Sequence, residues 1–399
     1  MSYSTLVNVM PDGSEPAILK VLNSISAVPA SDWDTCAVHN GYNPFTTHAY
    51  LLALEVSGSA TKETGWQARH LVLEGADGRI LGVVPLYLKT HSYGEYVFDW
   101  SWAEAYERAG GSYYPKLQSA VPFTPATGPR LLIHPDAPKD TQAVLAQGLI
   151  DVAKQLGVSS LHVTFPKRAE WDVLGQAGFL ERTGEQFHWL NHGYQTFDDF
   201  LGALTSRKRK AIKKERRAVG EAGVTIVTLE GAAITETHWD TFYRFYRATS
   251  DLKWGQAYLT RNFFSEIGRT MSDATVLMLA EKDGDILAGA LNFRGADTLY
   301  GRWWGATAGV HVPFLHFELC YYQAVDYAIN HGLARVEAGA QGTHKLARGY
   351  MPTETFSAHW IRDGGFANAV QDFLDQERRA VSDDIGRMAA LGPFRRDKD

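Results

Sequence analysis

Two stretches of the chain carry the same alternation of apolar and polar positions and predict β-hairpins. Residues 71–87 read LVLEGADGRILGVVPLY, and residues 277–293 read LMLAEKDGDILAGALNF. In each stretch an Asp-Gly pair separates two apolar runs, and Asp-Gly supplies the positive φ angles that a tight hairpin needs. The pairs are Asp77-Gly78 and Asp283-Gly284. The pattern therefore occurs twice, half a chain apart, and indicates an internal repeat.

Each hairpin is followed by a further aromatic strand, an apolar helix and a short strand. The first half predicts a helix at 141–156 and a strand at 160–165, and the second half predicts a helix at 313–330 and a strand at 335–338. Pro313 suits the first turn of its helix, and Gly157 and Gly332 suit helix ends. Two such copies predict an α/β (α+β) protein with mixed, largely antiparallel sheets flanked by helices. We place the two domains at 1–194 and 195–399.

The first half also carries an insertion, residues 93–129, which contains FDWSWAEAYERAGGSYYPKL and PFTPATGPR. Its prolines and glycines disfavour regular helix or strand, so we expect an ordered loop. Long ordered loops in compact domains are often functional. We therefore expect this loop to face the second half across a cleft and to bind substrate or donor. The side chains expected to do so are Asp99, Trp100, Tyr113 and Lys116.

The composition fits a folded cytoplasmic protein. The chain has 399 residues, of which 45% are hydrophobic and 21% are charged, as in ordinary globular proteins. It has no apolar run of about 18 residues, the length of a membrane-spanning helix, and its first residues lack the pattern of a secretory signal. Cys36 and Cys320 form no disulfide framework, which suits a reducing compartment. We expect a cytoplasmic location, free or peripheral at the inner face of the membrane.

One segment concentrates positive charge on a chain whose net charge is −6. Residues 207–217 read RKRKAIKKERR, with Lys or Arg at eight of eleven positions. Asp198 and Asp199 precede this segment, where acids favour the positive end of a helix dipole, and Gly220 and Gly223 follow it. The pattern predicts a basic helix. It is either a solvated surface or a docking patch for a polyanion: RNA, the phosphates of a coenzyme or carrier, or an anionic membrane.

The densest set of reactive side chains lies in VEAGAQGTHKLARGYMPTETFSAHW, residues 336–360. A carboxylate and imidazoles can deprotonate an amine, which acyl transfer to nitrogen requires. Lys345 and Arg348 are expected to bind a phosphate or to stabilise an oxyanion. The alternative is a salt-bridged loop without catalysis. The residues that we predict to be catalytic are Glu337, His344 and His359.

The preceding segment, LYGRWWGATAGVHVPFLHFE, adds three candidates for binding substrate or donor. Arg302 and Trp303 lie on a predicted strand, and His311 lies just before a predicted helix. The chain contains no HExxH, no Cys/His zinc spacing, no GxSxG and no P-loop. We therefore expect no metal and no tightly bound cofactor.

Several motifs resemble the FemAB-like branch of the GNAT acyltransferase superfamily. RKRKAIKKERRAVGEAGV looks like the basic helix that opens the second half in that branch. FDWSWA, YYPKL, PFTPATGPRLL and EAGAQGTHKLARGYMP look like motifs of the predicted N-acyltransferases labelled peptidoglycan biosynthesis/recognition. The resemblance covers residues 43–375 and implies two tandem GNAT-like domains and acyl transfer to an amine. One departure is that RWWGAT, residues 302–307, stands where that superfamily has its glycine-rich pyrophosphate loop.

The resemblance implies two kinds of reaction. Some similar proteins are bacterial ceramide synthases, which join fatty acyl-CoA to a sphingoid-base amine, and FemAB proteins use aminoacyl-tRNA to extend a peptidoglycan precursor. We favour the first, an acyltransferase that moves groups other than aminoacyl groups. Trp-rich strands suit a long apolar chain, because each buried CH₂ contributes about 0.8 kcal/mol.

This favoured reaction uses a thioester of coenzyme A or acyl carrier protein as co-substrate and a lipid amine as acceptor. The basic segment 207–217 then contacts an anionic membrane. The first alternative is a tRNA-dependent transferase that acts on a peptidoglycan precursor. The second is a non-catalytic module that binds cell-wall or lipid head groups.

Overall fold

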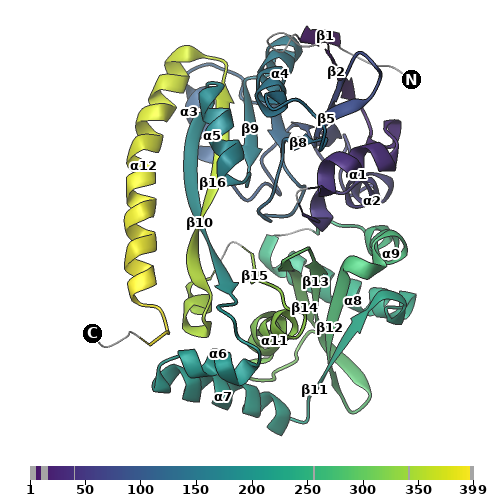
Figure 1. The fold of residues 1–399 in the computed structure, drawn as a ribbon. Coiled ribbons are helices and arrows are strands. Elements are labelled where there is room, and N and C mark those ends of the chain that lie inside the picture. Colours follow the sequence, from purple (N-terminus) through teal and green to yellow (C-terminus); the bar gives the residue numbers. More distant parts are fainter. Residues whose placement is uncertain (1–5, 10–16, 40, 255–256, 340–341, 396–399) are drawn as a thin grey trace. The chain divides into compact units, whose positions relative to one another are not determined.

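The computed structural model describes residues 6–9, 17–39, 41–254, 257–339 and 342–395 (Figure 1). The chain divides into two compact units, the first drawn from residues 1–184 and 354–382 and the second from residues 185–353 and 383–399. The predicted halves are defined by a repeat in the sequence, whereas these units are defined by contacts in space. Segment 354–382 accordingly packs in the first unit, although it belongs to the predicted second half.

The first unit contains two sets of paired strands. Strands β1-β2-β4-β5-β8 form an antiparallel sheet in that order. Strands β16-β9-β7-β6-β3 also pair in order, with β7 and β9 parallel and the other neighbours antiparallel. The bounds are β1 Leu6–Val9, β2 Ala17–Leu22, β3 Trp66–Ala68, β4 His70–Glu74, β5 Ile80–Val84, β6 Tyr87–Lys89, β7 Lys116–Ser119, β8 Leu132–Ile133, β9 Ser160–Thr164 and β16 Met351–Ile361.

Helix α4 closes the main core of the first unit. Its apolar face buries Leu145 and Leu149 together with Leu19 of β2 and Leu161 of β9, as the 3.6-residue period of an amphipathic helix requires. The helices are α1 Ala30–Val38, α2 His48–Val56, α3 Trp100–Arg108, α4 Thr141–Leu156, α5 Arg168–Gln176 and the first part of α12 Gly364–Ala390.

The second unit is built on strands that pair in the order β11-β12-β13-β14-β15-β10. All neighbours are antiparallel except β14 and β15, which are parallel. The bounds are β10 Leu180–Leu190, β11 Thr225–Glu230, β12 Thr275–Lys282, β13 Asp285–Arg294, β14 Thr298–Ala306 and β15 Arg335–Glu337. Strands β10 and β16 each run along the chain from one unit into the other.

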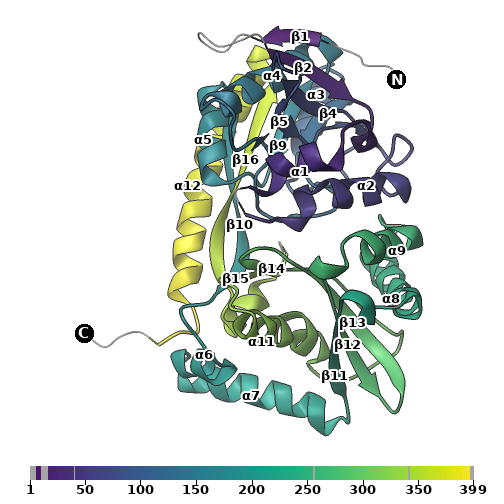
Figure 2. The same cartoon turned by 45° about the vertical axis from the view of Figure 1, so that its right-hand side comes forward.

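Helices cover both faces of these strands (Figure 2). Ala324 and Ala328 of α11 pack with Met278 of β12 on one face, and Phe242 of α8 packs close to Gly289 of β13 on the other. The helices are α6 Phe197–Ala203, α7 Ser206–Glu221, α8 Glu236–Trp254, α9 Arg261–Thr270, α10 Leu315–Phe317, a π-helical turn η5 Glu318–Tyr322, α11 Gln323–Asn330, a 3₁₀ turn η6 Thr343–Arg348 and the end of α12.

The repeat that the sequence predicts is present in both units. The helix predicted at 141–156 is α4 and ends at Gly157, whose φ is 72°. The second hairpin turns through Asp283 and Gly284, with φ of 53° and 87°. The first hairpin also forms, but of its predicted turn residues only Gly78 has a positive φ. Asp77 instead accepts a hydrogen bond from the backbone N–H of Arg79.

Three expectations about local structure are wrong. The insertion 93–129 is not all loop, because 100–108 contains no Pro or Gly and forms α3, which buries Trp102. Asp198 and Asp199 begin a separate helix, α6, and the chain leaves helical geometry at the buried Leu204 before α7 starts. The helix predicted from Pro313 begins at Leu315 and passes through η5.

The packing of α8 on β14 yields a stability prediction. A Cβ added at Gly305 would lie 2.3 Å from the backbone oxygen of Phe245. Because backbone cannot yield as a side chain does, Gly305→Ala should lower the free energy of unfolding by about 1–3 kcal/mol, measured by urea denaturation. Gly301→Ala on the same strand is the control, since its Cβ would meet no atom nearer than 3.4 Å. Equal losses in the two variants would contradict this account.

Candidate active site

The segment that follows β15 turns sharply on three glycines. Gly339, Gly342 and Gly349 have φ of 80°, 111° and 89°, values that a side chain with a Cβ rarely adopts. A Cβ at Gly342 would also lie 2.4 Å from Cε1 of His344. These turns fold the chain into η6, whose residues include His344, Lys345 and Arg348. Three of the predicted site residues therefore share one short turn.

Lys345 is bound to the backbone at the end of β15. Its side chain is buried, and Nζ donates to the carbonyl oxygens of Ala338 at 2.6 Å and Gly339 at 2.8 Å. Burial, together with the charge of Arg302, lowers the pKa of Lys345 to about 7. The protonated form has three N–H donors, so it keeps one N–H beyond the two that these carbonyls accept.

His344 is exposed and is oriented by a tyrosine. Its Nε2 lies 2.9 Å from the hydroxyl of Tyr321, and its ring lies against Phe317. Tyr321 belongs to the π-helical turn η5, a local widening that often occurs at functional sites. An imidazole that is both accessible and held by a hydrogen bond has the arrangement of a general base.

Arg348 fixes η6 to α7. Its guanidinium donates to both carboxylate oxygens of Glu215, at 3.0 and 2.9 Å, and to the carbonyl of His344 at 2.9 Å. Its carbon Cζ lies 3.4 Å from the ring centroid of Phe317, a cation–π contact. Glu215 also accepts a hydrogen bond from the hydroxyl of Tyr322 in η5. One carboxylate on α7 therefore holds both segments that carry the candidate site.

Glu337 lies at the end of β15 and is buried. It stands opposite His188 of β10 and beside Tyr300 of β14. Burial lowers the pKa of His188, and the charge of Glu337 opposes that effect. Glu337 therefore interacts with buried groups of the sheet rather than with solvent.

The other candidates of the second unit lie on or after β14. Arg302 stands over the indole of Trp303, with 5.4 Å between its Cζ and the ring centroid. Its effect on the pKa of Lys345 places it near that side chain. His311 is exposed on the connection between β14 and α10. The structure thus brings Arg302 toward η6 and leaves His311 on the surface of the unit.

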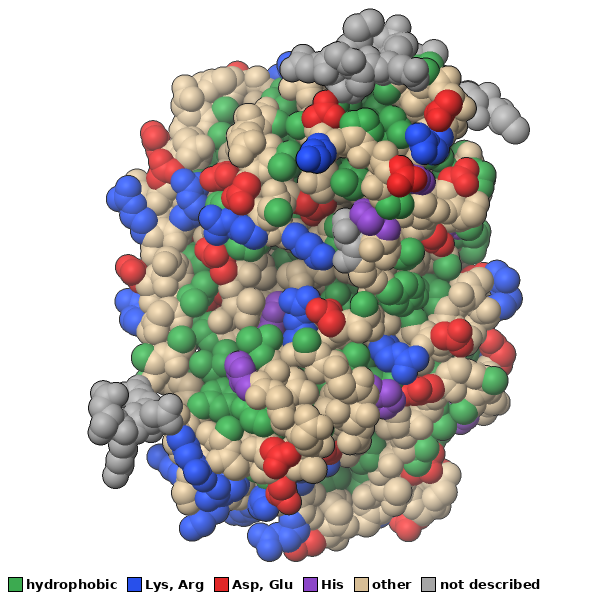
Figure 3. Space-filling model, in the orientation of Figure 1, with side chains coloured by type: hydrophobic (Ala, Val, Ile, Leu, Met, Phe, Trp, Pro, Cys, Tyr) green, Lys and Arg blue, Asp and Glu red, His purple; other side chains and the backbone are tan. Residues whose placement is uncertain are grey.

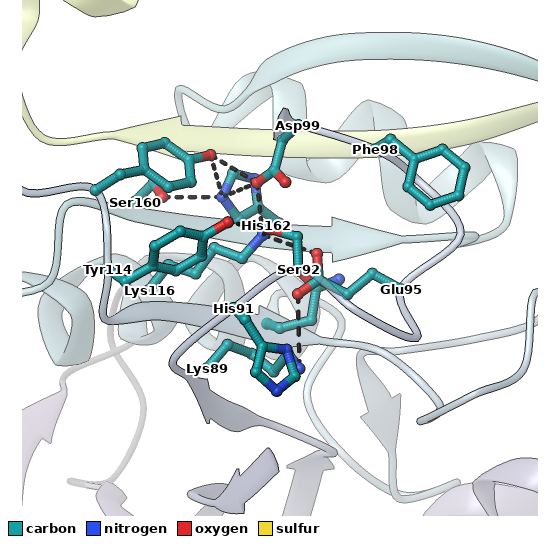
Figure 4. Close-up of polar contacts among 12 residues, drawn as sticks. Lys89, His91, Ser92, Glu95, Phe98, Asp99, Tyr114, Lys116, Ser160 and His162 are labelled. Carbon is teal, nitrogen blue, oxygen red and sulfur yellow. Dashed lines mark hydrogen bonds and ion pairs between the residues drawn. The ribbon is translucent and has the colours of Figure 1, made fainter. Parts of the chain in front are cut away.

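The remaining candidates lie in the first unit, and all of them except Trp100 belong to a buried polar network (Figure 4). Lys116 donates from Nζ to Ser92 Oγ at 2.7 Å, Glu95 Oε2 at 2.7 Å and Asp99 Oδ2 at 2.5 Å. Tyr113 donates its hydroxyl to the same oxygen of Asp99 at 2.6 Å. Lys116, Asp99 and Tyr113 are all almost fully buried. Three residues that the insertion was predicted to offer to a ligand are therefore bonded to one another.

Two histidines extend this network. His162 Nδ1 lies 2.7 Å from His359 Nδ1, and His162 Nε2 lies 2.9 Å from Ser160 Oγ. Burial and the charge of Lys116 lower the pKa of His162 to about 3, and burial and His162 lower that of His359 well below its usual value. Both rings are therefore neutral near pH 7. His359 belongs to the first unit, whereas Glu337 and His344 belong to the second.

Burial also shifts the charged groups around Lys116. It raises the pKa of Glu95 to about 7 and lowers that of Lys89 to about 7. Burial works against the charge of Lys116, but Glu95 and Asp99 together raise the pKa of this lysine. Trp100 stands apart, with 47% of its surface exposed at the start of α3. The binding and catalytic roles of all these candidates stay predictions.

Sequence analysis missed several residues that build both clusters. Glu215 is the one acid within the basic segment, Tyr321 lies in an apolar helical stretch, and His162 lies in an apolar strand. A polar residue in an apolar segment is the signal that marks the last two, because a buried polar group needs a partner. Nothing local identifies the partners, since they come from distant segments.

Other site types find no support in the described parts of the chain. Among those residues, no three His, Cys, Asp or Glu side chains are grouped to hold a metal ion. No helix in the described ranges has the length and apolar character to cross a membrane.

The buried network of the first unit yields a prediction. Lys116→Met leaves Asp99 without its lysine and Glu95 with only Lys89, whose Nζ lies 3.9 Å from Oε1, and removing one partner of a buried ion pair costs about 3–5 kcal/mol. Urea denaturation should show a loss of this order. Adding Glu95→Gln should restore part of it, because one uncompensated charge is removed. A Lys116→Met protein as stable as the wild type would contradict the network.

Lys345 yields a prediction about pH. The folded chain holds its amine neutral above pH of about 7, whereas the unfolded chain keeps it protonated up to the ordinary value of 10.5. Between these values the unfolded state binds more protons, so the contribution of Lys345 to the free energy of unfolding rises with pH. Lys345→Met should therefore show a smaller rise than the wild type between pH 7 and about 9 in denaturation experiments. Identical slopes would rule out the depressed pKa.

Comparison with known proteins shows the fold and the family. Three similar solved structures are FemX, the C-terminal domain of a putative lysylphosphatidylglycerol synthetase from Agrobacterium fabrum, and L-PGS from Bacillus licheniformis. Their identities to this chain are 12%, 10% and 9%, and their TM-scores are 0.55, 0.52 and 0.50. The matches cover 86%, 87% and 84% of this chain and 98%, 96% and 98% of the other chains. They confirm the expected fold class of mixed, largely antiparallel sheets flanked by helices.

A search of curated protein sequences gave no significant match. The names of the three similar structures mention neither a ceramide synthase nor acyl-CoA, so the favoured lipid substrate finds no support in them. A family model described as FemAB-like, peptidoglycan biosynthesis/recognition, matches residues 24–396. That match spans nearly the whole chain, and the protein is therefore a member of the FemAB-like family, with a function of the acyl- or aminoacyl-transferase kind.

Proposed function

We propose that this protein transfers an aminoacyl group from aminoacyl-tRNA to an amine of a peptidoglycan precursor. The description of its family supports the acceptor. The name lysylphosphatidylglycerol synthetase, borne by a protein of similar fold, supports aminoacyl transfer. The observation that carries the proposal is η6, where an accessible imidazole and a lysine with an unused N–H lie side by side in sequence on one anchored turn.

The reaction forms an amide and breaks an ester. The acceptor nitrogen attacks the aminoacyl carbonyl carbon, and a tetrahedral oxyanion forms. The bond between that carbon and the 3′ oxygen of the tRNA then breaks. The proton that leaves the attacking amine is transferred to the departing 3′ oxygen, so the products are an amide and a tRNA with a free 3′-hydroxyl. No oxidant, reductant or metal ion takes part.

Each role in this reaction falls to a residue of η6 or its support. His344 accepts the amine proton and returns it to the leaving oxygen, with Tyr321 fixing the orientation of the ring. The free N–H of Lys345 stabilises the oxyanion, and its attachment to two carbonyls holds it in place before substrate arrives. Glu337 and Arg348 are positioning residues, because both interact with protein groups rather than with open solvent.

This proposal replaces the thioester of acyl-CoA or acyl carrier protein with the ester of aminoacyl-tRNA. The family description and the names of the similar structures favour this change. An aminoacyl-tRNA donor also does not require the glycine-rich pyrophosphate loop, which residues 302–307 do not match. Arg302, Trp303 and His311 remain candidates for contacts with the donor. Their place on and after β14, with Arg302 near Lys345, is compatible with that role.

The direct test is transfer of a labelled amino acid. Purified protein is incubated with tRNA charged with radiolabelled amino acids and a peptidoglycan precursor that carries a free amine. Label should appear in the precursor in a form stable to mild alkali, since an amide survives conditions that hydrolyse the aminoacyl ester. His344→Ala should lower kcat by about 10²-fold or more.

His192→Ala is the matched control, because His192 is also an exposed histidine of the second unit. It should keep wild-type kcat. The proposal is wrong if aminoacyl-tRNA gives no product while long-chain acyl-CoA and a lipid amine do. The role of His344 alone is wrong if its alanine variant keeps full turnover.

A further inference from the structure

Helix α7 presents a ridge of cations to solvent. Arg207, Lys210, Lys214 and Arg217 are exposed, and their spacing of three, four and three residues places them along one face of the helix. At 1.5 Å per residue the ridge is about 15 Å long. Figure 3 shows Lys and Arg side chains gathered over the region of α6 and α7. This charge stands out on a chain whose net charge is −6.

Within the described part of the chain, most of these cations have no acidic partner. Within the described ranges, Lys213 pairs with Asp198 at 3.0 Å, Arg217 with Glu221 at 3.8 Å, and Arg216 with Glu318 and Asp326. The structure gives the others no ion pair in those same ranges: Arg207, Lys208, Arg209, Lys210 and Lys214. Like charges three or four residues apart repel and weaken a helix. An external anion would remove that cost.

The opposite face of α7 is fixed to the body of the second unit. Ile212 and Val219 are buried in its core, and Arg216 stacks on Phe197 with 4.4 Å between its Cζ and the ring centroid. Glu215 holds Arg348 of η6. The helix is thus a rigid support, and the residues that carry its charge cannot turn inward without breaking these contacts.

This arrangement distinguishes among anionic partners. A helix that lies in a membrane interface buries an apolar face in lipid, but the large apolar side chains of α7, Ile212 and Val219, are already buried in protein. The exposed face of α7 therefore presents only a straight row of positive charges to a partner. That is the requirement for binding the phosphate backbone of a nucleic acid, which needs no apolar insertion.

We propose that α7 is the docking surface for the RNA of the donor, through its phosphate backbone. This inference rests on the proposed function, which makes aminoacyl-tRNA the donor. Since Glu215 of the same helix anchors η6, RNA docked on the exposed ridge is held by the helix that also holds the turn carrying His344 and Lys345. Docking and chemistry are therefore supported by different faces of one helix.

The test measures binding of deacylated tRNA as salt is raised. Four phosphate contacts, one for each cation of the ridge, give a slope of log K against log salt of about −3. Arg207→Gln/Lys210→Gln/Lys214→Gln should weaken binding about 10-fold or more and make the slope shallower by about 2 to 3. These side chains are exposed, so the variant should unfold at the wild-type urea concentration.

The matched control removes the same charge elsewhere. Lys62→Gln/Lys139→Gln/Arg379→Gln takes one arginine and two lysines from exposed positions of the first unit, and it should bind tRNA as the wild type does. The docking proposal fails if the α7 variant also binds tRNA like the wild type. It fails equally if wild-type protein binds vesicles of anionic phospholipid through α7 and binds no tRNA.

The outcomes separate this proposal from the proposed function. If aminoacyl transfer proceeds and the α7 variant keeps the wild-type KM for aminoacyl-tRNA, the docking surface is wrong and the transferase assignment stands. If α7 binds tRNA with the expected salt dependence but no aminoacyl group is transferred, the surface stands and the transferase assignment falls.

Discussion

The second unit depends on one shared carboxylate. Glu215 accepts hydrogen bonds from Arg348 of η6 and from Tyr322 of the π-helical turn, so three segments far apart in sequence meet at a single group. Both oxygens of Glu215 accept from Nη2 of Arg348, while Nη1 donates to the carbonyl of His344, so the guanidinium is held from two sides. Glu215 thus adds a polar attachment to the apolar one that Ile212 and Val219 provide.

The two units use buried charge in different ways. In the first unit Lys89 and Lys116 pair with Glu95 and Asp99 out of contact with water, and the neutral pair His162 and His359 continues the network. Such groups carry a large desolvation cost that only their mutual contacts offset. In the second unit Lys345 is buried against carbonyls, which bear no net charge. Its depressed pKa follows from that difference, and it leaves a cation that is only partly satisfied.

Local sequence signals predicted elements well where local physics decides them. Helix α4 and its terminal Gly157, the second hairpin at Asp283-Gly284 and the basic helix α7 all follow from periodicity, turn geometry or composition. Errors arose where packing overrode those signals. Part of the insertion forms a helix that buries Trp102, and the buried, extended Leu204 lies between two helices that the acids and bases alone would have joined.

The sequence by itself determined the mixed α/β character, the repeated hairpins, the family and the concentration of cations on one helix, because these depend on neighbours along the chain. Only the tertiary structure decided that Asp99, Tyr113 and Lys116 bind one another, that His359 pairs with His162, and that Glu215 holds Arg348. A buried charge pairs with groups that are close in space, whatever their separation along the chain. The pairing is required because an unpaired buried charge has a large desolvation cost. A list of reactive residues therefore contains the candidates for a site but not the contacts that make some of them structural and leave others free to meet a substrate.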